Sequence, residues 1–228
     1  GLVDAVRITE IPLRGKFRLG PFDLEMVTMT HSILEPNGLA IRTKFGTVFH
    51  TGDWKIDPEP LLGELTDEAL LKRIGDEGVL AMVCDSTNVF VEGEAGSEAM
   101  VRANLRELLK GRTGRVAVTC FASNLARVES IALAAVAVGR HPVLSGPALL
   151  RMIEAAQDCG YMLDFPECVS PQDGAYLPKD KVLFICTGSQ GEPRASMAKI
   201  ANDEHRDLIL EEGDTAIFSS RVIPGNER

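Results

Sequence analysis

The regular alternation of strand-like and helix-like segments after about residue 97 is the feature that most constrains how this chain can fold. Most of the strand-like runs are apolar, and several of the helix-like segments that follow them end at a glycine. Such alternation is typical of a parallel, doubly wound sheet covered by helices. The expected strands are 115–120, 142–144, 181–186 and 215–219, and the expected helices are 98–110, 125–138, 148–159 and about 195–201.

The first part of the chain, up to about residue 57, instead contains short β-prone segments separated by turn residues. The apolar run 78–84 is continuous, which predicts a strand covered on both faces. We therefore interpret the chain as two domains, a β-rich one over residues 1–96 and an α/β one over residues 97–228. In the first domain the expected strands are 27–30, 38–43 and 47–50, with a hairpin turn at 44–46 and a helical or irregular crossing over 58–77.

Composition excludes several classes of protein. No apolar run approaches the ~20 residues that a membrane-spanning helix needs. The net charge of −9 argues against non-specific binding to DNA or acidic membranes. The five cysteines have no C-x-x-C spacing, so we interpret them as small buried side chains in a reducing compartment, the cytoplasm. The chain begins without methionine and has no visible signal peptide, and we expect it to be a segment of a longer protein.

Small, polar and glycine-rich residues follow the strands of the α/β part. In a parallel sheet these strand ends share one edge, where ligands bind. Short side chains there let backbone N–H groups approach an anion such as phosphate, although each loop is alternatively only a tight turn with a helix cap. No G-x-G-x-x-G or P-loop pattern occurs, which disfavours dinucleotide binding. The loops are 121–124, 145–147, 187–193 and 219–226.

One histidine and two aspartates, His31, Asp53 and Asp85, follow successive predicted strands of the first part. Imidazole nitrogen and carboxylate oxygen are suitable ligands for zinc or manganese. Asp53 comes soon after the apolar run 46–49, and a buried carboxylate there would need a cation or several donors. The alternatives are a hydrogen-bonded histidine and an ordinary turn aspartate. His50 is assigned a packing or supporting role.

Several of these motifs resemble those of a known enzyme family. The chain resembles the β-CASP nucleases of the metallo-β-lactamase fold, and the ribonuclease J family in particular. The similarity runs in order from about Val27 to Glu227. The motifs are Thr30-His31-Ser32, His50-Thr51-Gly52-Asp53, Cys84-Asp85-Ser86-Thr87-Asn88, Phe121-Ala122-Ser123-Asn124, Thr187-Gly188-Ser189-Gln190-Gly191-Glu192-Pro193 and Pro224-Gly225-Asn226-Glu227.

This resemblance implies an α/β fold, with part of a metallo-β-lactamase αββα core over residues 1–96. A β-CASP domain with a mainly parallel, doubly wound sheet would follow over residues 97–228. The implied activity is hydrolysis of RNA phosphodiesters in RNA maturation and decay, exonucleolytic from a 5′ monophosphate end and sometimes endonucleolytic. The resemblance also implies a homo-oligomeric full-length protein with no membrane partner. Two zinc ions would occupy the full active site, with manganese or magnesium as alternatives.

The resemblance also implies roles for individual residues. His31 would ligate one zinc ion, and Asp53 would bridge both ions. Asp85 would be a catalytic residue that supports the metal centre or proton transfer. The implied RNA-binding residues are Ala122, Ser123, Asn124, Ser189, Gln190, Gly191 and Glu192.

The sequence also departs from the family pattern. The H-x-H-x-D-H run that supplies most of the metal ligands is missing, and so is the C-terminal histidine motif. With four histidines in all, the chain by itself is expected to bind no zinc tightly and to cleave no RNA. Ala126 stands where relatives often carry a histidine. Two other functions stay open: a catalytically silent RNA-binding subunit, and a metallo-β-lactamase-type hydrolase of small thioesters or esters.

Overall fold

The computed structural model describes residues 6–221 of the chain, so the predicted motif at residues 224–227 lies outside the described residues. The described part divides into two compact units. The first contains residues 6–31 and 35–95, and the second contains residues 32–34 and 96–221. No helix within residues 6–221 is both long and apolar enough to span a membrane.

The first unit is built on a five-stranded sheet whose strands follow the order of the sequence. Strands β1 to β4 pair antiparallel, and β5 runs parallel to β4. Thr43 pairs with Gly46 across the turn between β3 and β4, which confirms the predicted hairpin. The elements of this unit are β1 (Lys16–Leu19), β2 (Phe22–Thr28), β3 (Asn37–Thr43), β4 (Gly46–His50), α1 (Glu68–Glu77) and β5 (Ala81–Val83).

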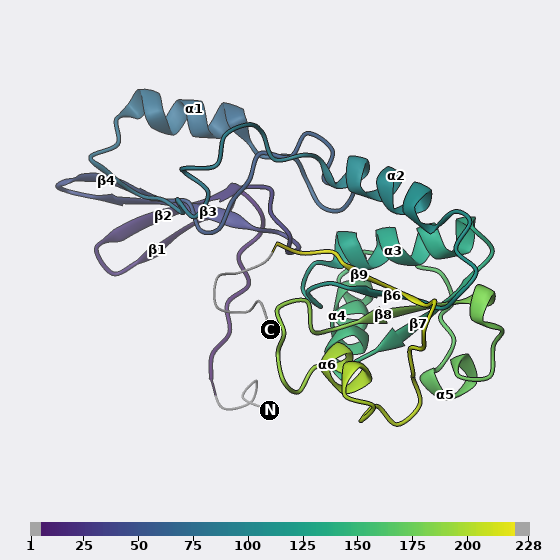
Figure 1. Ribbon diagram of the computed structural model, residues 1–228. Coiled ribbons are helices and arrows are strands. Elements are labelled where there is room, and N and C mark those ends of the chain that lie inside the picture. Colours follow the sequence, from purple (N-terminus) through teal and green to yellow (C-terminus); the bar gives the residue numbers. More distant parts are fainter. Residues whose placement is uncertain (1–5, 222–228) are drawn as a thin grey trace. The chain divides into compact units, whose positions relative to one another are not determined.

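The core of the first unit lies between this sheet and α1 (Figure 1). The helix begins after Asp67, whose carboxylate accepts a hydrogen bond from the backbone N–H of Leu70 at 2.9 Å. This N-cap explains why the irregular crossing becomes helical at that point. The buried residues of the core are Val27, Met29, Ala40, Phe49 and Ile74.

Strand β5 corrects one sequence prediction. The apolar run 78–84 is expected to be covered on both faces, but Leu80, Met82 and Val83 are exposed. Within residues 6–221, β5 pairs with β4 alone and forms an edge of the sheet. A continuous apolar run therefore indicates a strand here without indicating what covers it.

The second unit contains a four-stranded sheet in the order β7-β8-β6-β9. All of its strand pairs are parallel, which confirms the predicted parallel α/β architecture. The elements of this unit are α2 (Glu98–Leu109), β6 (Val116–Thr119), α3 (Leu125–Ala137), β7 (His141–Ser145), α4 (Pro147–Asp158), α5 (Pro171–Gly174), a 3₁₀ turn (Lys179–Lys181), β8 (Val182–Cys186), α6 (Ser196–Ala201) and β9 (Thr215–Phe218).

Helices cover both faces of the four-stranded sheet. Figure 1 shows α2 and α3 on one side of it and α6 on the other. All five residues of β8 are buried, as expected for an inner strand covered on both faces. Its alternate side chains Val182, Phe184 and Cys186 belong to one core cluster with Met197 and Ile200 of α6.

The cysteines follow the sequence prediction only in part. Burial raises the pKa of Cys120 and of Cys186 to about 12, so both thiols behave as buried, unreactive groups. Cys159, by contrast, is exposed at the end of α4.

Candidate functional site

Three neighbouring strands of the second unit end side by side. Thr119 at the end of β6 lies opposite Cys186 of β8 and Phe218 of β9. Because these strands are parallel, the loops that follow them leave the same edge of the sheet. The loops are residues 120–124, 187–193 and 219–221, and the first two contain the predicted RNA-binding residues.

The loop after β6 is a turn that caps α3. The side-chain oxygen of Asn124 accepts a hydrogen bond from the Arg127 N–H at 3.1 Å, and the Asn124 N–H donates to the Phe121 carbonyl at 3.1 Å. Asn124 is therefore the N-cap of this 13-residue helix, as the capping interpretation predicts. Ala122 and Ser123 are half-buried in the same turn. A short hydroxyl side chain thus lies beside the start of a helix.

Two hydrogen bonds connect the loop after β8 to the segment after β9. The Gln190 side-chain amide donates to the Arg221 carbonyl at 2.9 Å, and the Ser220 hydroxyl donates to the Ser189 carbonyl at 2.9 Å. Within the loop, the Gln190 N–H donates to the Glu192 carboxylate at 2.9 Å. The predicted RNA-binding residues of this loop therefore belong to one hydrogen-bonded arrangement.

Two buried side-chain atoms of this loop, one in Ser189 and one in Gln190, have no hydrogen-bond partner among the described residues. The exposed fraction of Ser189 is 7%, and within residues 6–221 its hydroxyl has no hydrogen-bond partner. The side-chain oxygen of Gln190 is also buried without a partner there. Leaving such a group unpaired costs about 1–3 kcal/mol. A bound ligand or water that pairs with these atoms would recover that free energy.

A serine and a histidine also meet in this unit. The Oγ atom of Ser145, at the end of β7, lies 3.0 Å from Nε2 of His205. The Nδ1 atom of His205 accepts hydrogen bonds from the N–H groups of Asp207 at 3.2 Å and Leu208 at 3.1 Å. Because Nδ1 is an acceptor in the neutral ring, Nε2 carries the proton and donates a hydrogen bond to the Ser145 hydroxyl. The pair is therefore a structural contact, since His205 has no free nitrogen to activate the serine.

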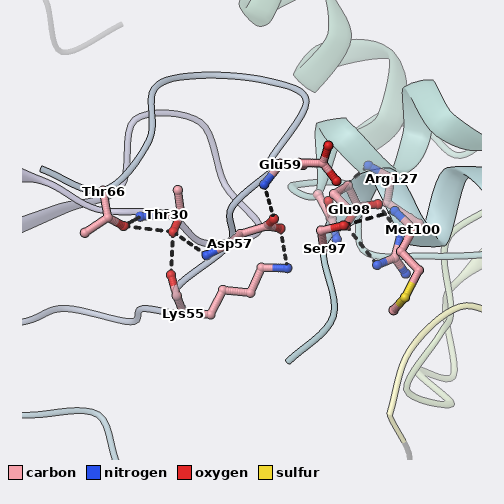
Figure 2. A network of polar contacts seen from close by, with 10 residues as sticks. Thr30, Lys55, Asp57, Glu59, Thr66, Ser97, Glu98, Met100 and Arg127 are labelled. Atoms are coloured by element: carbon pink, nitrogen blue, oxygen red, sulfur yellow. Dashed lines mark hydrogen bonds and ion pairs between the residues drawn. The ribbon is translucent and has the colours of Figure 1, made fainter. Parts of the chain in front are cut away.

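In the first unit, the buried carboxylate of the sequence stretch 49–57 is Asp57 and not Asp53. Asp53 is exposed, so its charge needs no cation to offset burial. Asp57 is 2% exposed, and its carboxylate lies 2.8 Å from Nζ of Lys55 and accepts a hydrogen bond from the Glu59 N–H at 2.9 Å (Figure 2). Lys55, in the same stretch of chain, therefore neutralises the charge of the buried Asp57 carboxylate.

Thr30 connects this stretch to the rest of the first unit (Figure 2). Its hydroxyl donates to the Lys55 carbonyl at 2.5 Å and accepts from the Asp57 N–H at 3.1 Å. It also lies 2.9 Å from the Thr66 hydroxyl, which itself accepts from the Thr30 N–H at 3.0 Å. Since Thr30 has only one hydroxyl hydrogen, Thr66 is the donor of that bond. The network fixes the backbone at Thr30, next to His31, and at Lys55, two residues from Asp53.

Asp85 lies beside the segment that carries Asp53. The Trp54 indole donates to the Asp85 carbonyl at 3.2 Å, and the Asp85 N–H donates to the Thr51 hydroxyl at 3.2 Å. Hydrogen bonds from the hydroxyl and the N–H of Thr87 lower the pKa of Asp85, and the charge of the nearby His31 lowers it further. The structure therefore brings the three predicted metal-site segments into one region of the first unit.

Comparisons with known proteins identify the family of the chain. The family model described as "Ribonuclease J, beta-CASP domain" matches residues 113–228, which is half of the chain. The chain belongs to the ribonuclease J β-CASP domain family. Proteins named Ribonuclease J are 48% identical in Sinorhizobium meliloti and 41% identical in Mycolicibacterium smegmatis, over 100% and 97% of this chain. The chain spans only 42% and 40% of the lengths of these two relatives.

A solved structure has a similar fold. It is the crystal structure of a protein of unknown function from Enterococcus faecalis V583, with a TM-score of 0.56 and 15% identity. The match covers 78% of this chain and 44% of that chain. At this identity the likeness concerns the fold alone.

The described residues of this family member contain no complete metal-binding group. Within residues 6–221, no group of three or more histidine, cysteine, aspartate or glutamate side chains is close enough to hold a metal ion. His31, Asp53 and Asp85 have suitable donor atoms for zinc, but they do not form such a group. The described residues therefore do not fit a zinc site on their own. The roles assigned to these three residues stay predictions.

Two residues of this β-CASP chain were not singled out by the sequence. Arg127 and Glu98 form an ion pair between α3 and α2, with Nε of Arg127 2.5 Å from Oε1 of Glu98 (Figure 2). The only signal available was an arginine in the first turn of a helix, where a cation is unfavourable next to the helix dipole. Such a residue needs an acidic partner, but the sequence does not indicate which one.

Proposed function

We propose that the protein from which this chain comes hydrolyses RNA phosphodiesters, and that the loops 121–124 and 187–193 bind the RNA end. The proposal rests on membership of the ribonuclease J β-CASP family and on relatives that bear the name Ribonuclease J. We further propose 5′-to-3′ exonucleolytic cleavage from a 5′ monophosphate end, with endonucleolytic cleavage as a second mode. The place of action would be the cytoplasm, in a homo-oligomer.

The observation that carries the RNA-binding part is the unpaired hydroxyl of Ser189. Phosphate oxygens are strong acceptors, and serine hydroxyls and backbone N–H groups commonly bind them. Ser123 offers a second hydroxyl on the loop after β6, the strand next to β8. A phosphate placed at this edge would satisfy a donor that the fold leaves without a partner.

The metal-dependent part of the proposal concerns the first unit. We propose that His31 and Asp53 contribute to zinc binding and that Asp85 supports the centre. Because the described residues lack a three-donor group, further ligands are required from outside residues 6–221. Bound metal ions would lower the pKa of a water molecule and stabilise charge on the phosphoryl oxygens.

Binding of a short single-stranded RNA, measured by fluorescence anisotropy, tests the RNA-binding part. Replacing Ser189 by alanine is expected to raise the Kd about tenfold, since a hydrogen bond to a charged phosphate is lost. Ser196→Ala is the matched control, because the Ser196 hydroxyl is equally buried but donates to the Ser145 carbonyl at 2.8 Å. Equal Kd values for the Ser189→Ala chain and the unchanged chain would contradict the proposal.

The cleavage part is tested with the full-length protein. Zinc-dependent release of nucleotides from RNA with a 5′ monophosphate, and slower release from RNA with a 5′ hydroxyl, is the expected result. Tight RNA binding with no cleavage at any metal concentration would instead identify a silent RNA-binding subunit. Hydrolysis of a thioester by a protein that binds no RNA would identify a metallo-β-lactamase-type hydrolase.

A further inference from the structure

Two ion pairs connect α2 to α3 in the second unit. In the first, the guanidinium of Arg102 contacts the Glu129 carboxylate and donates to the Ser130 hydroxyl at 2.9 Å. In the second, Arg127 binds both oxygens of Glu98, with Nε 2.5 Å from Oε1 and Nη2 3.0 Å from Oε2. The two pairs have the same chemistry, but they differ in what else their arginine contacts.

Arg127 alone of the two arginines also reaches the end of a strand. Its Nη1 donates to the Ser219 hydroxyl at 2.7 Å and to the Ser219 carbonyl at 3.2 Å. Its backbone N–H donates to the side chain of Asn124 at 3.1 Å. One residue therefore contacts both the turn that follows β6 and the segment that follows β9, the strand beside β6. Arg102 instead contacts Glu129 and Ser130, which both lie on α3.

Arg127 is poorly suited to bind a phosphate directly. Its side chain is 16% exposed, and its charge is neutralised by Glu98, whose side chain is 6% exposed. The contacts to Glu98 and Ser219 use four of its five N–H donors. A bidentate pair of this kind fixes geometry as well as charge.

We propose that Arg127 is a positioning residue for RNA binding. It holds the 121–124 turn against the 219–221 segment, which in turn is hydrogen-bonded to the 187–193 loop. Arg127 thereby keeps the hydroxyls of Ser123 and Ser189 at a fixed spacing. This inference rests on the proposed function of these loops in binding the RNA end.

The test compares matched lysine variants of the two arginines. Lysine keeps the positive charge but cannot bind Glu98 bidentately and reach Ser219 at the same time. Arg127→Lys is expected to raise the Kd for a short single-stranded RNA about tenfold, whereas Arg102→Lys should change it less than twofold. Ser219→Ala and Ser130→Ala form a milder pair that removes only one hydroxyl acceptor each.

Amide hydrogen exchange gives a readout that does not depend on RNA, because it reports local opening of the backbone. Arg127→Lys and Ser219→Ala should speed exchange at residues 121–124 and 219–221 several-fold more than Arg102→Lys and Ser130→Ala do. Equal exchange in both sets of variants would overturn the inference, even if Arg127→Lys proved too unstable to purify. If the unchanged chain binds no RNA, the proposed function fails, while the exchange data still decide whether Arg127 positions the loops.

Discussion

The hydroxyl groups of Thr30 in the first unit and of Ser189 in the second differ in how many hydrogen bonds they make. The Thr30 hydroxyl donates one hydrogen bond and accepts two, which is the most a hydroxyl can do. The Ser189 hydroxyl is buried to a similar degree but has no partner within residues 6–221. The fully paired Thr30 hydroxyl contributes to the stability of the fold, whereas the unpaired Ser189 hydroxyl can still bind a ligand.

The largest expected effect tests the saturated side of this comparison. Replacing Thr30 by valine, which has nearly the same volume, leaves the Lys55 carbonyl, the Asp57 N–H and the Thr66 hydroxyl without their partner. At about 1 kcal/mol for each lost bond, the free energy of unfolding should fall by about 3 kcal/mol. Urea unfolding followed by the fluorescence of Trp54 measures it, since this is the only tryptophan and lies in the first unit. A change below about 1 kcal/mol would contradict the structural role.

A smaller effect is expected for the two aspartates of the stretch 49–57. Asp57→Asn removes the charge that pairs with Lys55, and because Lys55 is 28% exposed and can turn to water, the expected cost is about 2 kcal/mol. Asp53→Asn is the matched control on an exposed site and should change the free energy of unfolding by less than about 0.5 kcal/mol. The opposite ranking in urea unfolding would mean that Asp53 is the buried carboxylate.

His205 predicts a pH dependence of the second unit. Burial is the main cause that lowers its pKa, with Lys199 acting in the same direction and Asp207 against it. The neutral ring is favoured by the fold, so its contribution to stability is complete above the unfolded-state pKa of about 6.5. As the pH falls below that value, the unfolded chain takes up the proton first and this contribution is lost. Thermal unfolding followed by far-UV circular dichroism should show a melting temperature that falls between about pH 7.5 and about pH 5, an interval that spans this reference pKa.

The control for this pH effect is His205→Asn, which keeps an acceptor for the N–H groups of Asp207 and Leu208 but does not titrate. Its melting temperature should change less than that of the unchanged chain over the same pH interval. An identical slope in both proteins would assign the pH dependence to other groups.

The smallest expected loss of stability belongs to Ser189→Ala. Since the hydroxyl has no partner to lose and its unpaired burial is unfavourable, its removal should leave the free energy of unfolding unchanged or raise it by up to about 1–3 kcal/mol. Urea unfolding followed by circular dichroism measures this. A loss of more than about 1 kcal/mol would show that the hydroxyl is paired, and the contrast with Thr30 would disappear.

The sequence predicted those features of the fold that depend on local pattern. The helix predicted to begin at residue 98 does so, capped by Ser97, whose hydroxyl accepts from the Met100 N–H at 3.1 Å. The apolar run at β8 is fully buried. Strand β1 was missed because Lys16–Leu19 is short, charged and mostly exposed, so that only its pairing with β2 defines it. Local propensity gives little information about such a strand.

The candidate site was predictable at the level of loops but not of contacts. The residues of loops 121–124 and 187–193 follow strands of one parallel sheet, as the alternation of elements implies, but the structure alone shows that these two strands are neighbours. The partners of Arg127 lie 29 and 92 residues away along the chain, and no sequence spacing indicates such pairs. Which carboxylate of 49–57 is buried likewise depends on the bridge between Thr30 and Lys55.

The strand order β7-β8-β6-β9 has a consequence for how the second unit folds. Neither strand that pairs with β6 is adjacent to it in the sequence, since β8 and β9 come much later in the chain. Arg115, just before β6, donates its backbone N–H to the carboxylate of Asp214, 99 residues away. Closing such long loops before any contact forms is slow. During synthesis, β6 therefore stays unpaired until β8 has been made. Its apolar residues are exposed in that interval and could bind a chaperone.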